Sequence, residues 1–214
     1  MKVGILGSGI VGQTVGAKFA QLGYETKIGT RDPQKLSDWT TRVGSHGSVG
    51  MPDQAAAFGD ILVLATRWAN GATENAIRMA NPAHFAGKVV IDITNPLDMS
   101  TGKPTLSVGQ TDSGGEVVQR LIPDARVVKA LNIVTASTMV NPAQSGGEPD
   151  MFIAGNDAEA KQEVTDILRQ FGWQGVVDLG GIESARYLES LSMIWFLYMR
   201  QTQKLTHAFK LVGK

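Results

Sequence analysis

Three glycines near the N-terminus have the spacing of a phosphate-binding turn. Gly7, Gly9 and Gly12 belong to the run Gly7-Ser8-Gly9-Ile10-Val11-Gly12, which has the form G-x-G-x-x-G. In such a turn the first glycine permits a sharp bend, the second lets the backbone approach a pyrophosphate, and the third lets a helix pack close to a strand. The pyrophosphate then meets free N–H groups at the start of that helix. The run therefore predicts a dinucleotide site rather than a purely structural turn.

The residues around Arg31 bear on which dinucleotide binds. An acidic residue here would bond the ribose 2′-OH of NAD, whereas Arg and small hydroxyls suit the 2′-phosphate of NADP. Asp32 stands directly before Pro33, which is typical of a helix N-cap followed by Pro at the first helical position. Thr30, Arg31 and Lys35 then remain as three donors, two of them cationic, and they favour NADP. The alternative is that Arg31 and Lys35 are solvated surface charges.

Alternating strands and helices must position these residues. The glycine run lies between an expected strand at residues 2–6 and a helix at 11–22, followed by a strand at 25–29. Further strands are expected at residues 48–51, 60–65, 88–93 and 126–131, with helices at 34–43, 53–58, 71–80 and 115–121, and a loop at 98–115. This alternation predicts an α/β fold with a Rossmann-type doubly wound parallel sheet.

Ligands bind such sheets beyond the carboxyl ends of the strands. That rule adds the residues that end the later strands, which are Thr66, Arg67, Asn95, Pro96, Ala130 and Asn132. Asn132 is the best polar candidate near a nicotinamide ring. Hydride transfer from a nicotinamide ring to another ring stacked on it requires mainly that the two rings are oriented and that water is excluded. We therefore predict no dedicated catalytic residue.

Several charged and aromatic residues are expected to have structural roles. Asp92 and Lys129 lie inside expected strands. Glu183, Arg186 and Glu189 include an i, i+3 pair, which we expect to be a surface ion pair. Trp68 and Trp195 could form the wall of a flavin pocket, but large aromatic side chains more often pack in a core.

Composition excludes several classes of partner and site. The 20 basic and 20 acidic side chains cancel, so charge indicates neither nucleic acid nor an anionic membrane. The absence of Cys and the wide spacing of the three His residues indicate no disulfide, thiolate or metal site. No apolar run reaches membrane-spanning length, and the chain starts with a strand rather than a signal region, so we expect a cytoplasmic protein.

A loop near residues 141–149 divides the expected fold. Residues 1–140 are predicted to form an NADP-binding Rossmann domain. Residues 141–214 would form a smaller C-terminal α/β domain, with strands at 151–154 and 175–179, a helix at 158–171 and a long final helix at 182–210. The final helix is apolar on nearly all sides, so we expect it to be buried or to pack against a second copy in a homodimer.

Six stretches of the sequence resemble one known family. They are Val3-Gly4-Ile5-Leu6-Gly7-Ser8-Gly9-Ile10-Val11-Gly12, Ile28-Gly29-Thr30-Arg31, Ile91-Asp92-Ile93-Thr94-Asn95-Pro96-Leu97, Val128-Lys129-Ala130-Leu131-Asn132, Ile153-Ala154-Gly155-Asn156-Asp157 and Ser184-Ala185-Arg186-Tyr187-Leu188-Glu189-Ser190-Leu191. Through them the chain is similar to the NADPH:deazaflavin oxidoreductases, or F-420-dependent NADP reductases, and their bacterial relatives. It also resembles the reductase domain of mammalian membrane metalloreductases.

The resemblance implies a role for each part of the site. Thr30 and Arg31, with Lys35, would hold the 2′-phosphate, and the backbone of residues 8–12 would hold the pyrophosphate. Thr66-Arg67 and Asn95-Pro96 would lie along the ribose and nicotinamide, and Ala130-Leu131-Asn132 would surround the ring. The chain departs from the family pattern at Arg67, where proline is common, and at Asn132, where deazaflavin enzymes can carry histidine.

Three hypotheses about function follow from the sequence. The first is an NADPH-dependent reductase that passes hydride to a small-molecule acceptor, either a deazaflavin or a flavin. The second is a non-catalytic NADPH-binding sensor or partner subunit. The third, a β-hydroxyacid or imine reductase, would need a longer all-helical second domain than this chain offers.

Overall fold

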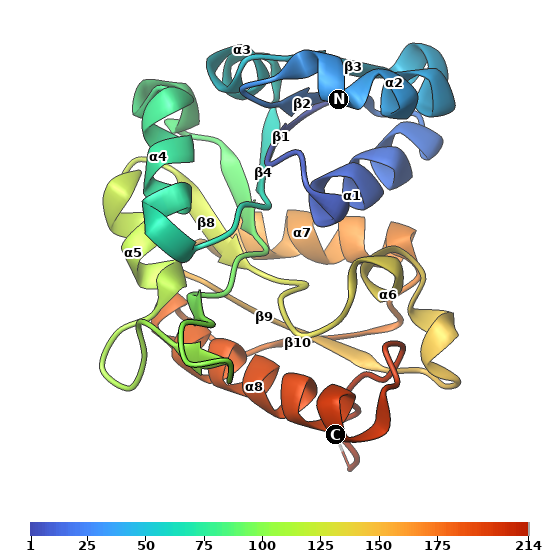
Figure 1. The fold of residues 1–214 in the computed structure, drawn as a ribbon, viewed down its shortest axis with the longest axis vertical. Helices are drawn as coiled ribbons and strands as arrows, with labels where there is room; N and C mark the ends of the chain where they lie inside the picture. Colours follow the sequence, from blue (N-terminus) through green and yellow to red (C-terminus); the bar gives the residue numbers. More distant parts are fainter. Residues whose placement is uncertain (214) are drawn as a thin grey trace.

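The computed structural model describes residues 1–213, and its strands form an eight-stranded sheet with the order β10-β9-β8-β5-β4-β1-β2-β3. Helices lie on both faces of this sheet (Figure 1), which confirms the predicted Rossmann-type α/β fold. The strands are β1 (Lys2–Leu6), β2 (Glu25–Gly29), β3 (Gly47–Gly50), β4 (Ile61–Leu64), β5 (Val89–Asp92), β8 (Arg126–Lys129), β9 (Asp150–Gly155) and β10 (Gly175–Asp178).

The strands predicted for the C-terminal domain extend the same sheet. β9 pairs with β8 in antiparallel orientation, with Val128 opposite Gly155, and β10 pairs with β9 in parallel orientation. The remaining neighbours in the sheet pair in parallel. The predicted domain boundary falls after α6 (Ala136–Val140), so the two predicted domains share one sheet.

Two apolar cores separate the helices into two layers. Ile61 and Val63 of β4 face one core, whereas Leu62 and Leu64 face the other, because successive side chains of a strand point to opposite faces. The first core is covered by α1 (Ile10–Gln21), α2 (Ser37–Val43), α6 and α7 (Ala158–Phe171). The second is covered by α3 (Pro52–Phe58), α4 (Ala72–Met79), α5 (Gly114–Leu121) and the start of α8 (Ala185–Thr202). Both faces of the central strands are therefore buried, as their continuous apolar runs predict.

The predicted helix after Pro33 consists of a 3-10 turn, η1 (Pro33–Leu36), followed by α2. Asp32 occupies the N-cap position as predicted, but within the described chain its side chain forms no capping hydrogen bond. The carboxylate instead lies 3.3 Å from the Lys35 ammonium one turn later. Charge attraction to Lys35 thus replaces the expected cap.

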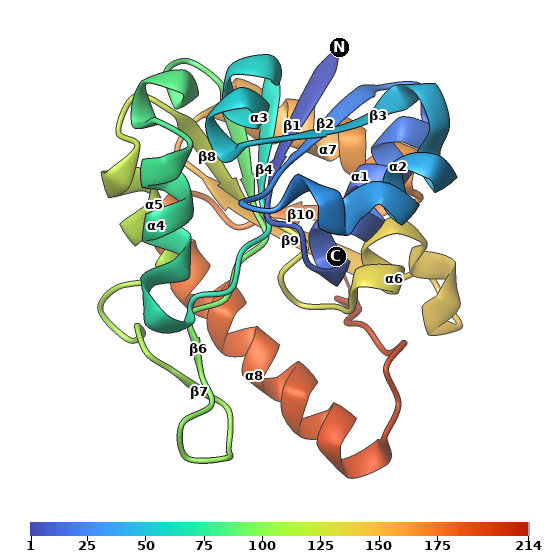
Figure 2. The same cartoon turned by 45° about the horizontal axis from the view of Figure 1, so that its top comes forward.

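Two predictions about the later part of the chain are wrong. The expected loop at residues 98–115 contains a short hairpin, β6 (Leu97–Asp98) and β7 (Thr105–Leu106), which projects beside α8 (Figure 2). The final helix ends at Thr202 rather than at residue 210, because Gln203 takes a left-handed conformation with φ 59°. The chain then turns back, so that the His207 ring stacks on Trp195 at 4.6 Å and Phe209 accepts a hydrogen bond from the Asp150 N–H of β9.

Shorter 3-10 turns join the main elements. They are η2 (Gly44–His46), η3 (Ala69–Gly71), η4 (Pro82–Phe85), η5 (Pro142–Ser145) and η6 (Ile182–Ser184). Among the helices of residues 1–213, none has the length and apolar character needed to cross a membrane.

Candidate cofactor-binding site

The predicted site residues emerge at one edge of the sheet. Leu6, Gly29, Leu64, Asp92 and Lys129 lie in register across β1, β2, β4, β5 and β8. Because these strands are parallel, the residues that follow them leave the sheet side by side at its carboxyl edge. The strand register therefore brings together the glycine turn and the four later groups of predicted residues.

Each glycine of the turn has a distinct surrounding. A Cβ atom at Gly7, whose φ is +126°, would lie 2.3 Å from the Ala65 carbonyl oxygen, and one at Gly12 would lie 1.9 Å from the Gly7 oxygen. A Cβ at Gly9 would meet no described atom within 4 Å. Gly7 and Gly12 are thus required by the fold, whereas Gly9 borders open space of the kind that an approaching pyrophosphate needs.

The start of α1 suits an anion. Gly9 is its N-cap, no side chain within the described residues caps it, and its first turn contains no acidic residue. Gln13 stabilises the turn by donating from its side chain to the Ser8 carbonyl at 2.8 Å. The first N–H groups of a helix lack partners within it, so they are available to phosphate oxygens.

The end of β2 places two of the predicted phosphate ligands beside each other. Thr30 is buried, and its hydroxyl accepts the Asp32 N–H at 3.3 Å. Arg31 is exposed. Lys35 is also exposed, with 79% of its side chain accessible, and it pairs with Asp32. Of the two cations Arg31 and Lys35, Arg31 is therefore the one that does not pair with Asp32.

The turn after β4 is fixed by two threonines. The Thr66 hydroxyl lies 2.9 Å from that of Thr73 in α4, which in turn donates to the Arg67 carbonyl at 3.0 Å. Arg67 is exposed at this edge, whereas Trp68 is buried in the second core. Trp68 and Trp195 are both buried, as expected for core residues.

The ends of β5 and β8 are joined by a pair of carboxamides. Asn95 donates to the Asn132 carbonyl at 2.7 Å, and Asn132 donates to the Asn95 side-chain oxygen at 2.9 Å. The Asn132 amide also donates to the Leu188 carbonyl of α8 at 3.1 Å. Pro96 and Ala130 are buried beside these residues in the sequence. The predicted ring-binding residues of β5 and β8 thus lie in direct contact.

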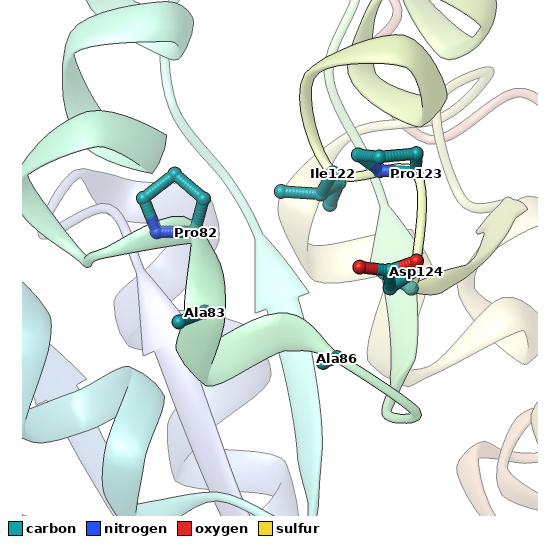
Figure 3. A pocket seen from close by; sticks show the side chains of 7 residues that line it. Pro82, Ala83, Ala86, Ile122, Pro123 and Asp124 are labelled. Carbon is teal, nitrogen blue, oxygen red and sulfur yellow. The ribbon is translucent and has the colours of Figure 1, made fainter.

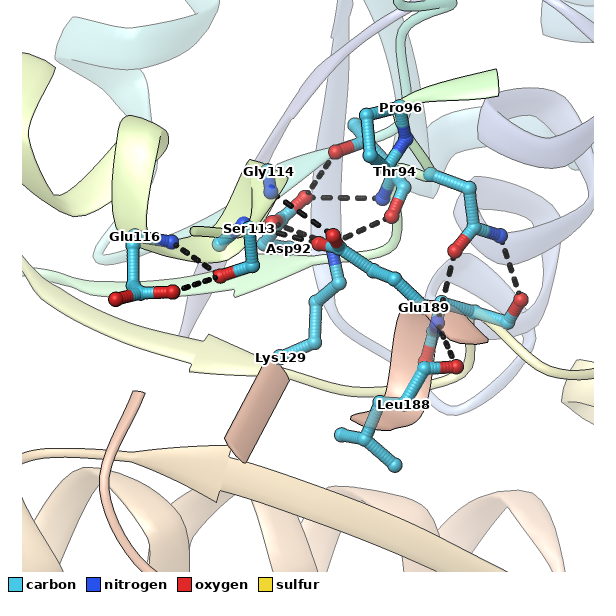
Figure 4. Close-up of polar contacts among 12 residues, drawn as sticks. Asp92, Thr94, Pro96, Ser113, Gly114, Glu116, Lys129, Leu188 and Glu189 are labelled. Carbon is cyan, nitrogen blue, oxygen red and sulfur yellow. Dashed lines mark hydrogen bonds and ion pairs between the residues drawn. The ribbon is translucent and has the colours of Figure 1, made fainter. Parts of the chain in front are cut away.

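Asp92, Lys129 and Glu189 form a buried ion cluster (Figure 4). The Lys129 ammonium lies 2.9 Å from Asp92 Oδ2 and 2.8 Å from Glu189 Oε1, and it donates to the Thr94 carbonyl at 2.6 Å. Glu189 also accepts the N–H groups of Gly114 and Gly115 at the start of α5. The structural roles expected of Asp92 and Lys129 fit this arrangement, because all three ammonium protons are engaged.

The surface ion pair expected among Glu183, Arg186 and Glu189 is not formed by Glu189. Glu189 is fully buried because α8 docks its first turns against the N-terminus of α5. Arg186 instead binds Glu116 of α5 with two hydrogen bonds of 2.8 and 2.5 Å. The i, i+3 spacing gives no sign of this contact, since it depends on how two distant helices pack.

Lys129 of the buried ion cluster and Glu116, which binds Arg186, both have shifted pKa values. Burial alone would lower the pKa of Lys129, but the charges of Asp92 and Glu189 outweigh it and raise that pKa above its ordinary value. The hydrogen bond from Arg186, with a smaller contribution from Ser113, lowers the pKa of Glu116 against a partial burial effect. Lys129 therefore stays an ammonium and Glu116 a carboxylate near neutral pH.

Two other observations bear on where ligands could bind. A pocket of about 130 Å³ lies between η4 and the residues that lead into β8, at the opposite edge of the sheet (Figure 3). Asp124 is its one titratable lining residue, and none of the predicted site residues lines it. Within residues 1–213, no group of three or more His, Asp or Glu side chains could hold a metal ion.

Comparison with known proteins gives concordant matches. The family described as "NADP oxidoreductase coenzyme F420-dependent" matches residues 2–96. A crystal structure from Arthrobacter sp. FB24, assigned as an F420-dependent NADP reductase, is 40% identical and covers 99% of each chain with a TM-score of 0.94. The F420-dependent NADP reductase of Methanothermobacter thermautotrophicus is 25% identical over 206 residues, which are 90% of this chain and 86% of that protein.

Longer proteins also match. Metalloreductase STEAP3 of Rattus norvegicus is 28% identical over 193 residues, and the alignment covers 90% of this chain but only 36% of that protein. The chain thus spans about a third of the length of the metalloreductases it matches. Because a 40%-identical relative is matched along its whole length and the family match covers the glycine turn and β1 to β5, the chain belongs to the family of coenzyme F420-dependent NADP oxidoreductases.

Proposed function

We propose that this protein transfers hydride between NADPH and a deazaflavin or flavin-type acceptor. The observation that carries the proposal is the carboxyl edge of the sheet, where an uncapped helix start and an open Gly9 stand next to Thr30 and Arg31 on one side. On the other side the edge continues over β4 and β5 to the Asn95–Asn132 pair. Across the sheet from β2 through β1 to β5 and β8, the order of these groups matches the order of 2′-phosphate, pyrophosphate and nicotinamide along an extended NADP.

The residues of the chain would bind and orient rather than react. When bound, NADPH supplies a hydride from C4 of its nicotinamide. The N–H groups at the start of α1 would hold the pyrophosphate, and Thr30 and Arg31, with Lys35, the 2′-phosphate. The segments Thr66-Arg67 and Asn95-Pro96 would lie along the ribose and the ring. The proton that accompanies the hydride can reach an acceptor nitrogen from solvent, so no acid–base side chain is needed.

The acceptor is proposed from the relatives. Two matched proteins are described as F420-dependent NADP reductases, which supports a deazaflavin. A flavin offers the same tricyclic shape and is the alternative acceptor. The longer relatives are described as metalloreductases, but this gives no direct support for a metal acceptor here, because this chain matches only about a third of their length.

The proposal is tested by following NADPH oxidation at 340 nm under anaerobic conditions. Coenzyme F420, FMN, FAD and riboflavin are supplied in turn, NADH replaces NADPH as the control for the 2′-phosphate, and the Gly9→Ala variant controls for adventitious reduction. Turnover with NADPH and one of these acceptors, well above the rate with NADH, is expected. Tight NADPH binding without turnover would favour a non-catalytic NADPH-binding module instead.

We also propose that the protein is a homodimer built on α8. Leu188, Ser192 and Trp195 of this helix face the protein's own core. The opposite face exposes Tyr187, Ile194, Leu197 and Tyr198, with 57% of Ile194 and 61% of Leu197 accessible. A two-fold contact would cover this apolar face with the same face of a second copy.

A further inference from the structure

The Asn132 carboxamide carries an unused acceptor. Its side-chain oxygen Oδ1 is buried and has no hydrogen-bond partner among residues 1–213, and the whole residue is only 5% exposed. Buried polar side-chain atoms in native proteins nearly always have a partner, and a missing one is unfavourable. An orphan acceptor next to the ring end of the proposed site suggests that a ligand supplies its donor.

The hydrogen-bond network fixes which atom is the oxygen. The Asn132 nitrogen faces the Leu188 carbonyl, which can only accept, so a flipped carboxamide would place two oxygens against each other. The Asn95 amide is fixed in the same way by the Asn132 backbone carbonyl, and its oxygen accepts from Asn132 Nδ2. Both orientations are thus determined by backbone carbonyls, and Oδ1 remains the free atom.

The backbone before Asn132 is strained. Leu131 is buried and has a φ of +63°, in the left-handed region that non-glycine residues rarely adopt. This conformation turns the chain at the end of β8, so that Asn132 meets Asn95 at the end of the neighbouring β5. Strained residues of this kind persist where the surrounding structure holds a group in place for function. The strained backbone of Leu131 and the unpartnered oxygen of Asn132 are therefore two unfavourable features that both accompany the placement of the Asn132 carboxamide.

The position of Asn132 along the sheet identifies the donor. With the pyrophosphate at β1 and the 2′-phosphate at β2, the rest of the cofactor must extend the other way, over β4 and β5 toward β8. The nicotinamide is the part that reaches β8, and its carboxamide NH₂ is the hydrogen-bond donor on that ring. We propose that Asn132 Oδ1 accepts a hydrogen bond from the nicotinamide carboxamide. Asn132 is then a positioning residue that fixes the rotation of the ring against the acceptor.

This inference rests on the proposed NADPH site, and the test separates the two. Binding of three ligands is measured by calorimetry: NADP⁺, its 3-acetylpyridine analogue, which lacks the NH₂ group, and 2′-phospho-ADP-ribose, which lacks the ring. Wild type is expected to bind NADP⁺ about tenfold more tightly than the acetylpyridine analogue, the loss of about 1.4 kcal/mol that one hydrogen bond can supply. This comparison needs no variant and so does not depend on folding.

The Asn132→Ala variant completes the test. It should lose that discrimination and bind NADP⁺ about tenfold more weakly, while its affinity for 2′-phospho-ADP-ribose stays at the wild-type value. Equal weakening for all three ligands, or unchanged preference for the carboxamide, would overturn the role of Asn132. Failure of wild type to bind 2′-phospho-ADP-ribose would instead overturn the proposed NADPH site itself.

Discussion

The Lys129 ammonium lies 2.8 Å from the Glu189 carboxylate in the interior of the protein, and this contact joins the end of β8 to the second turn of α8. Together with Asp92 the cluster has two carboxylates and one ammonium, all of them buried. The remaining negative charge is met by the N–H groups of Gly114 and Gly115 at the positive end of α5. The cluster therefore ties α5, α8 and the sheet together next to Thr94, whose carbonyl accepts a hydrogen bond from Lys129.

Removing the ammonium should strongly destabilise the fold. Lys129→Met leaves two buried carboxylates without a counter-ion, and breaking a buried pair in this way typically costs about 3–5 kcal/mol of unfolding free energy. Urea denaturation measures the loss. Lys161→Met is the control, because its pair with the partly exposed Asp178 should contribute less than about 1 kcal/mol. Equal effects of the two substitutions would contradict the stabilising role of the cluster.

The Glu116–Arg186 contact should make stability depend on acid pH. Arg186 lowers the pKa of folded Glu116 below its ordinary value of 4.5, so the contact stabilises the protein above that pH. Its contribution is lost as the pH falls below 4.5 and through the lowered pKa. The difference in unfolding free energy between wild type and Glu116→Gln should therefore shrink between pH 6 and about pH 3. A difference that stays constant over this pH range would refute the assignment.

Two glycine substitutions in the same turn should impair different properties, NADPH binding in one variant and the stability of the fold in the other. Gly9→Ala adds a methyl group that meets no described atom, at a φ of −74° that alanine accepts, so the unfolding transition should be unchanged or slightly higher. Its affinity for NADPH should fall at least tenfold, because the methyl group occupies the proposed phosphate space. Gly12→Ala places its methyl group 1.9 Å from the Gly7 oxygen and should destabilise the protein itself. Thermal melts and NADPH titration of both variants provide the measurement, and unimpaired NADPH binding by Gly9→Ala would argue against the site.

The charge of Arg31 should decide the preference for NADPH over NADH. Charge-assisted hydrogen bonds contribute about 1.5–3 kcal/mol, so Arg31→Ala should weaken NADPH binding by about 10- to 150-fold and leave NADH binding unchanged. Lys35→Ala should have a smaller effect, because Lys35 already pairs with Asp32 and is largely exposed. Parallel losses for NADPH and NADH in Arg31→Ala would place Arg31 outside the 2′-phosphate site.

The sequence predicts the fold well, and it predicts which residues follow the strands at the carboxyl edge of the sheet, because both depend on local patterns. The spacing of Gly7, Gly9 and Gly12 and the apolar runs that end at the later site residues are read directly along the chain. Burial of Glu189 could not be predicted, since it arises only when α8 meets the N-terminus of α5. The left-handed Leu131 likewise depends on contacts at the end of β8, including the Met151 sulfur that accepts its N–H. For the burial of Glu189 the sequence offers one signal, which is that this charged residue stands on an otherwise apolar face of the expected final helix.

The exposed face of α8 should govern the oligomeric state. Ile194→Asp with Leu197→Asp places two charges on side chains that are already exposed in the single chain, so its unfolding transition should change little. If α8 forms the proposed two-fold interface, light scattering at micromolar concentration should give twice the chain mass for wild type and the single-chain mass for the double variant. Val212→Asp, at an exposed apolar residue outside α8, should remain a dimer. A wild-type protein that is monomeric at this concentration would exclude the interface.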